Sequence, residues 1–219
     1  MHSRDRVPAV PAGYTRFVTP GAEVVAADRC AVAVRRAIGD ATLYGFAAAH
    51  PERRELRGRA AAYAVPLPDG ATRVVVRHSR HGGLLAPMTG DRFLAPTRAP
   101  HELATSVRLI EAGVPTPEVI AYAVYPAGGP FRRSDVATSD VAGARDLADV
   151  LGDRRSADLG PVLDATAALL RSLETAGARH PDLNAANVLV RRDDAGLYRA
   201  LVLEARHQEL PHANRGAFD

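Results

Sequence analysis

The sequence predicts an α+β fold in two parts, the first rich in strands and the second mostly helical. Three observations support this order: a β-hairpin pattern early in the chain, one long apolar stripe at helical spacing late in it, and a second short hairpin pattern after that stripe. Sheets and helices that segregate along a chain in this way are typical of α+β architectures. At 219 residues the chain is long enough to bury a sizeable core.

Turn and capping residues delimit each element. Asp28 can cap a helix, Pro-Leu-Pro-Asp-Gly at 66–70 forms a hairpin turn, Val-Pro-Thr-Pro at 114–117 cannot continue a helix, and Gly177 ends the long stripe. In chain order the sequence predicts helices at 28–38 and 42–50, strands at 59–65 and 72–77, a helix at 100–113, strands at 119–125 and 136–141, helical structure at 146–151, a long helix at 157–176, and strands at 188–190 and 201–203.

The composition is that of an ordinary soluble globular protein, with 47% hydrophobic and 24% charged residues. All 28 basic side chains are arginines, because the chain contains no lysine. The formal net charge is only +3, so no nucleic-acid partner is expected. The single cysteine, Cys30, excludes an internal disulfide, and no signal-peptide or membrane-spanning run occurs, so the chain is expected to be cytoplasmic.

The segment HPDLNAAN at 180–187 has the spacing of a kinase catalytic loop, with Asp182 five positions before Asn187. Phosphoryl transfer needs a carboxylate that orients the attacking hydroxyl and an amide oxygen that helps to hold magnesium. Asp182 and Asn187 supply these groups, while His180 is expected to brace the loop backbone and Leu183 to pack on the long helix. The alternative is that Asp182 and Asn184 only form side-chain turns between a helix and a strand.

Three further segments bring the chain closer to one family. RHSRHGGLL at 77–85, EAGVPTPEVIAY at 111–122 and DVATSDVAGARDL at 135–147 resemble, in order and spacing, segments of the lipopolysaccharide kinases, in particular the 3-deoxy-D-manno-octulosonic acid (Kdo) kinases. The resemblance covers roughly residues 58–204. It implies a two-lobed protein-kinase-like fold, in which an N-terminal antiparallel sheet with one helix precedes a small, mostly helical C-terminal lobe.

The resemblance also implies a nucleotide site. Gly58 matches the glycine turn that covers the nucleotide, and Arg77 ends a strand where a kinase places the lysine that grips the phosphates. Glu102 is the expected helix partner of Arg77. The backbone from Ser139 to Val141 matches the hinge that binds adenine. The implied cofactors are ATP and Mg²⁺, with Asn187 as one metal ligand.

The second metal ligand departs from the pattern. Kinases place an aspartate after the second hairpin, but this chain reads LVLEARH, with Glu204 at that position and Ala205 in place of an aromatic residue. The leading hypothesis is an ATP-dependent phosphotransferase acting on a sugar hydroxyl of a lipopolysaccharide core or lipid A precursor. The alternatives are a pseudokinase that serves as a binding module and another small-molecule kinase, which shares the loop but not the segments at 77–85 and 111–122.

The expected organisation follows from these assignments. Residues 1–55 are predicted to form an extension of strand and helices packed on the kinase-like domain, residues 56–141 the nucleotide-binding lobe, and residues 142–219 a reduced lobe with the catalytic loop. The implied partners are ATP and an anionic glycolipid or sugar acceptor. Contact with the cytoplasmic face of the inner membrane is a further expectation, because the implied acceptor is a lipid.

Overall fold

The computed structural model describes residues 7–39, 41–56, 61–79, 91–153, 159–178, 180 and 183–203. The chain divides into two compact units, one formed by residues 1–107 and 117–140 and the other by residues 108–116 and 141–219. Each unit has its own hydrophobic core. The domain boundaries expected from the sequence, at residues 55 and 141, remain predictions.

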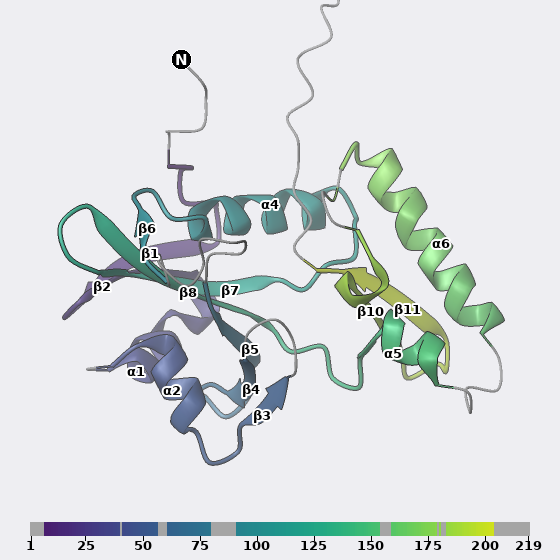
Figure 1. Ribbon diagram of the computed structural model, residues 1–219, viewed down its shortest axis with the longest axis horizontal. Helices are drawn as coiled ribbons and strands as arrows, with labels where there is room; N and C mark the ends of the chain where they lie inside the picture. Colours follow the sequence, from purple (N-terminus) through teal and green to yellow (C-terminus); the bar gives the residue numbers. More distant parts are fainter. Residues whose placement is uncertain are drawn as a thin grey trace, which may run out of the picture. The chain divides into compact units, whose positions relative to one another are not determined.

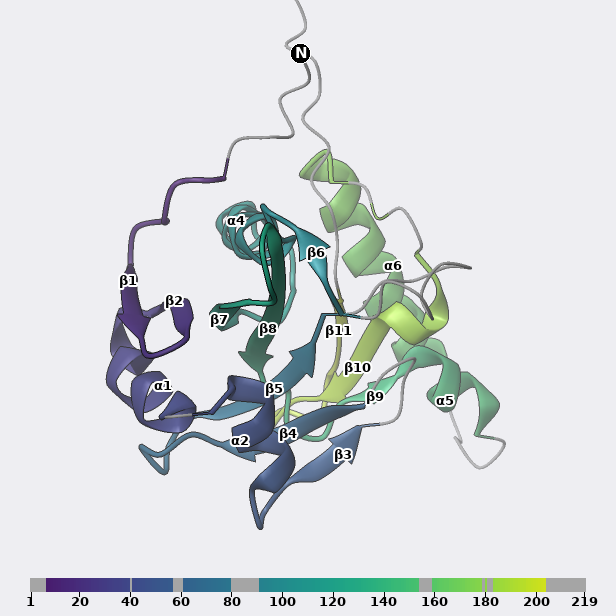
Figure 2. The same cartoon turned by 60° about the vertical axis from the view of Figure 1, so that its left-hand side comes forward.

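The first unit is built on an eight-stranded antiparallel sheet (Figures 1 and 2). Its strands run in the order β1 (Tyr14–Thr19), β2 (Ala22–Ala27), β7 (Val119–Pro126), β8 (Phe131–Ser139), β5 (Arg73–His78), β4 (Ala62–Pro66) and β3 (Arg54–Leu56), and β6 (Phe93–Leu94) also pairs with β8. The predicted β4–β5 hairpin is confirmed, with Val65 opposite Val74 across its turn. The antiparallel sheet and the helices confirm the expected α+β class.

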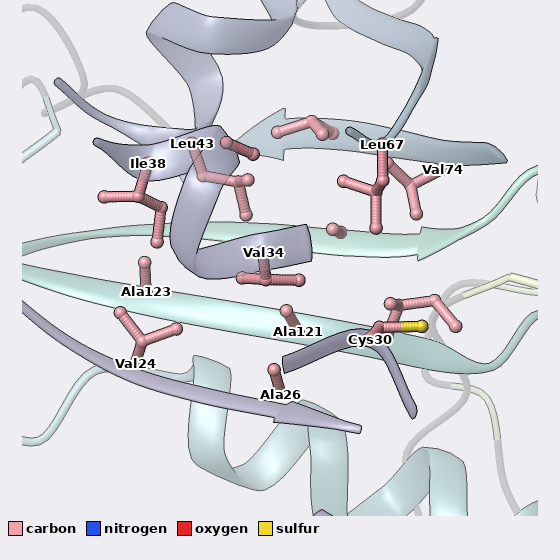
Figure 3. Close-up of a cluster of buried hydrophobic side chains, with 14 of the residues drawn as sticks. Val24, Ala26, Cys30, Val34, Ile38, Leu43, Leu67, Val74, Ala121 and Ala123 are labelled. Atoms are coloured by element: carbon pink, nitrogen blue, oxygen red, sulfur yellow. The ribbon is translucent and has the colours of Figure 1, made fainter. Parts of the chain in front are cut away.

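Helices cover both faces of this sheet (Figure 1). Helices α1 (Ala31–Ile38) and α2 (Leu43–Ala49) pack on one face, and α4 (Ala99–Glu111) packs on the other. Side chains of a strand alternate between faces, so β2 sends Val24 toward α1 and α2 and Val25 toward α4. Figure 3 shows the first of these cores, where Val24 and Leu43 lie among small side chains of the sheet. Both helices predicted in the first fifty residues are confirmed.

The second unit combines a small sheet with two helices (Figure 2). Strands β9 (Arg145–Asp146), β10 (Val188–Arg192) and β11 (Tyr198–Val202) form the sheet, and α5 (Leu147–Gly152) and α6 (Gly160–Thr175) pack against it. The predicted long helix is confirmed as α6, which buries Val162, Leu169 and Leu173. No helix among the residues described is both long and apolar enough to cross a membrane.

Candidate active site

Arg77 and Glu102 meet in the first unit as the sequence predicts. Arg77 lies one residue before the end of β5, and Glu102 lies in the first turn of α4. The Arg77 Nη2 atom donates a hydrogen bond to Glu102 Oε2 at 2.7 Å, and the two side chains are 26% and 28% exposed. Both side chains are therefore partly exposed to solvent. The contact joins the strand cation and the helix carboxylate that the sequence assigns to phosphate binding, and that role remains a prediction.

The backbone at Ser139 is already engaged in the sheet. Its N–H donates to the Glu118 carbonyl at 2.8 Å, and its hydroxyl accepts from the Glu118 N–H at 3.0 Å. The next amide, of Asp140, donates to the Arg73 carbonyl at 3.0 Å. Of the three backbone N–H groups at 139–141, the one left to donate to an adenine is therefore that of Val141, the first residue after the boundary between the two units.

Two arginines hold the side chain of Asp140. Its carboxylate is 7% exposed and lies 3.2 Å from Arg54 Nη2 and 3.4 Å from Arg73 Nε. These arginines come from β3 and β5, so both strands are tied to the last residue of the first unit. A nearly buried carboxylate with two cationic partners fixes the backbone that carries it more firmly than an exposed ion pair would.

In the second unit, the β10–β11 hairpin sets the position of Asn187. Val188 pairs with Val202, and one step further the Leu203 N–H donates to the Asn187 carbonyl at 2.8 Å. Asn187 ends a short 3₁₀ turn that Asn184 caps by accepting from the Ala186 N–H at 3.0 Å. The half-buried Asn187 is thus fixed opposite the residue that precedes Glu204 in the chain.

His180 has the structural role expected of it. Its Nε2 atom lies 2.7 Å from the Leu203 carbonyl oxygen, so the ring ties the start of the catalytic-loop segment to the residue that follows β11. Leu183 is 41% exposed and lines a shallow hollow with Leu170 and Leu173 of α6. It therefore borders the long helix rather than filling the core of this unit.

Three predicted site residues, Gly58, Asp182 and Glu204, lie outside the described residues. Within the part of the chain that is described, no cluster of three or more His, Cys, Asp or Glu side chains is placed to hold a metal ion. Asn187 and Glu204 remain the predicted protein ligands of Mg²⁺. Amide and carboxylate oxygens are the donors that this ion prefers, so the predicted pair fits it chemically.

A polar cluster centred on His78 has no role predicted from the sequence. His78 Nδ1 lies 2.6 Å from Asp135 Oδ1, and Nε2 lies 3.0 Å from Asp91 Oδ2. The hydrogen bond with Asp135 raises the pKa of His78, and contact with Asp91 adds to the increase, while burial opposes it. His78 and Asp135 both occur in the segments that resemble the family, but nothing in the sequence indicates that they meet.

A match to a known protein family covers most of the chain. Residues 52–209 match the model described as the lipopolysaccharide kinase (Kdo/WaaP) family. The chain belongs to this lipopolysaccharide kinase family. The matched residues include both halves of the Arg77–Glu102 pair and the catalytic-loop segment, so the resemblance found in the sequence is confirmed.

Curated members of the family give the same result. The chain is 34% identical over 143 residues to a 3-deoxy-D-manno-octulosonic acid kinase of Xanthomonas oryzae, covering 64% of this chain and 54% of that protein. It is also 34% identical over 136 residues to a protein of the same name from Stenotrophomonas maltophilia, covering 60% and 52%. The chain thus spans about half the length of the curated relatives that it matches.

A solved structure supports the fold. WaaP in complex with acyl carrier protein is 21% identical to this chain and superimposes with a TM-score of 0.51, covering 80% of this chain and 70% of WaaP. At this identity the likeness concerns the fold alone. It confirms the expected kinase-like architecture.

Proposed function

We propose that the protein is an ATP-dependent phosphotransferase that phosphorylates a sugar hydroxyl of a lipopolysaccharide core or lipid A precursor. The observation that carries this proposal is the 2.7 Å contact between Arg77 and Glu102, at the positions where a kinase holds its phosphate-gripping pair. Family membership and the names of the Kdo kinase relatives support the choice of acceptor.

Each proposed residue has a distinct task. Arg77 holds the α- and β-phosphates with two parallel guanidinium donors, and Glu102 keeps that side chain extended. Asp182 orients the acceptor hydroxyl and accepts its proton. Bound Mg²⁺ supplies neutralisation of the phosphate charge, with Asn187 and Glu204 as its protein ligands. The Gly58 turn and Val141 N–H complete the nucleotide site.

The acceptor determines where the protein works. A sugar on a lipid anchor stays at a membrane surface, so the enzyme would act in the cytoplasm and approach the inner membrane peripherally. The 28 arginines of the chain supply cations that can meet an anionic glycolipid.

The direct test is phosphate transfer from labelled ATP, with Mg²⁺, to a Kdo-containing lipid acceptor. The wild-type protein should label the lipid, and Asp182→Ala should lower the rate by about 100- to 10,000-fold, the range for loss of a proton-accepting side chain. Asp194→Ala is the matched control, because it removes an exposed carboxylate from the turn between β10 and β11 rather than from the catalytic-loop segment. Absence of labelling by the wild-type protein on every such acceptor would overturn the proposal.

A second candidate is a pseudokinase that binds nucleotide without turnover. It is favoured by Glu204 and Ala205, which replace the usual aspartate and aromatic residue, and by the absence of lysine. Glutamate is longer than aspartate by one methylene, and magnesium requires near-octahedral oxygens at about 2.0–2.1 Å. Nucleotide binding without transfer would favour this candidate over the enzyme.

Glu204→Asp decides between the two candidates. If geometry at the metal limits the rate, this substitution should increase transfer by at least about 10-fold, because small displacements of catalytic groups change rates by that order or more. If transfer is undetectable in both proteins while nucleotide binding persists, the protein is a binding module.

A further inference from the structure

His78 lies next to Arg77 but on the opposite face of the sheet. Side chains of β5 alternate, so Val74, Val76 and His78 point toward α1 and α2, and Arg77 points toward α4. The His78 side chain is 15% exposed, and its ring centre lies 5.6 Å from that of Tyr44 in α2. The residue that follows the proposed phosphate-gripping arginine is therefore buried among polar partners.

Carboxylates bind both ring nitrogens of His78. Asp135, which is fully buried in β8, faces Nδ1 at 2.6 Å, and Asp91 faces Nε2 at 3.0 Å. An ionised carboxylate only accepts hydrogen bonds, so a ring that satisfies both must carry two protons and a positive charge. The geometry thus selects the imidazolium form.

The surrounding charges favour the same form. The second oxygen of Asp135 accepts from the Tyr44 N–H at 2.9 Å, and Tyr125 is a further titratable side chain near it. Arg133 Nε lies 2.8 Å from Asp91, so Asp91 bridges two cations. Among the side chains that the structure describes, His78 is the one that forms an ion pair with the buried Asp135, and a buried charge without a partner is strongly unfavourable.

His78 also lies just beyond the point where the pairing of β5 with β4 ends. The β4–β5 ladder ends at the pair Ala62 and Arg77, whereas the β5–β8 ladder continues to His78 opposite Asp135. Among the described residues, β8 is the strand that still pairs with β5 beyond Arg77, and the bonds of the His78 ring hold the strand there as well. The backbone at Arg77 and His78 is continuous, so a His78 side chain held in place also fixes the direction of the Arg77 side chain. The orientation of Arg77 toward Glu102 therefore depends on the contacts of His78.

We infer that His78, as an imidazolium ion bridging Asp135 and Asp91, is a positioning residue that holds the end of β5 so that Arg77 meets the phosphates of the nucleotide. This role rests on the proposed nucleotide-binding function of Arg77. It makes nucleotide affinity dependent on pH. The bridge is complete below the raised pKa of His78 and is lost as the pH rises through it, because a neutral ring has only one donor.

The test measures ATP affinity and the KM for ATP between pH 6 and pH 9 on the whole chain. His78→Gln should weaken ATP binding by about 10-fold at pH 6, the usual size for loss of a supporting contact. It should also remove the decline in affinity at higher pH, while kcat at saturating ATP changes less. Dividing the wild-type profile by that of His78→Gln cancels the titration of ATP itself. The matched control is His50→Gln, which removes a histidine outside this cluster and should keep the wild-type profile.

Asp91→Asn is the milder second variant. The amide still accepts a hydrogen bond from Nε2–H but carries no charge, so the midpoint of the affinity decline should move to lower pH. Nitrogen-15 spectra of the imidazole should show both His78 nitrogens protonated at pH 6 in the wild-type protein. A ring protonated on one nitrogen at pH 6, or unchanged affinity and pH profile in His78→Gln, would overturn the role of His78 alone. Absence of ATP binding by the wild-type protein would instead overturn the proposed function as well.

Discussion

The two units hold their candidate site residues in different ways. In the sheet of the first unit, Arg77 is placed by an ion pair between side chains, with Glu102 at 2.7 Å. In the hairpin of the second unit, Asn187 is placed by its backbone, whose carbonyl accepts from the Leu203 N–H at 2.8 Å. The position of a residue held by a side-chain ion pair depends on charge and pH. The position of a residue held by backbone hydrogen bonds is kept when its side chain is substituted. Substitutions in the two units should therefore have different signatures.

The largest effect is expected in the second unit. Asn187→Ala removes the proposed metal-binding amide but keeps the backbone bond to Leu203, so turnover should fall by about 100-fold, the scale of losing one electrostatic contact in the transition state. The midpoint of thermal unfolding should change little. Steady-state kinetics and thermal unfolding on the same samples check this expectation. A large loss of stability would show that the side chain, rather than the backbone, holds this turn.

A smaller effect is expected in the first unit, and on binding rather than on turnover. Arg77→Met removes the guanidinium, so nucleotide affinity should fall by about 10-fold, the equivalent of one charge-assisted hydrogen bond. Arg77→Lys keeps the charge on a shorter side chain and should recover part of this loss. Titration calorimetry with ATP measures both variants. Equal affinity of Arg77→Met and the wild-type protein would remove Arg77 from the site.

The smallest effect is on stability. The folded-state pKa of His78 is raised above its ordinary value of 6.5, so its protonated form stabilises the fold fully below that value. This contribution is lost as the pH rises through the folded-state pKa. Chemical denaturation at pH 6 and pH 9 should therefore show a decrease in the free energy of unfolding that is absent from His78→Gln. The same decrease in both proteins would assign it to other groups.

Much of the fold was predictable because local chemistry determines it. The turn at 66–70, the apolar stripe that became α6 and Gly177, which has a φ of 60°, are all signals read from neighbouring residues. The strands β1 and β2 could be given no bounds from the sequence. β2 is stabilised by pairing with β7, almost one hundred residues later, and β1 is an edge strand that pairs with β2, so the place of this hairpin in the sheet depends on a contact that leaves no local pattern.

The same distinction applies to the site. The Arg77–Glu102 pair was predictable because a strand-end cation and a first-turn glutamate follow a known kinase pattern. The environment of His78 was not predictable from the sequence. Asp135 meets His78 through the register of β5 against β8, and Asp91, which precedes β6, meets it only in the folded chain. The arginine partners of Asp140 could not be predicted for the same reason, because they come from two other strands.

A double-mutant cycle on Arg77 and Glu102, read out as ATP affinity, tests the central claim most directly. If Glu102 acts by positioning Arg77, Glu102→Ala should weaken binding in the wild-type background and have almost no effect in Arg77→Met, giving a coupling energy of about 1 kcal/mol. Additive effects of the two substitutions would contradict the claim, because they would show that the two side chains touch without acting together on the nucleotide.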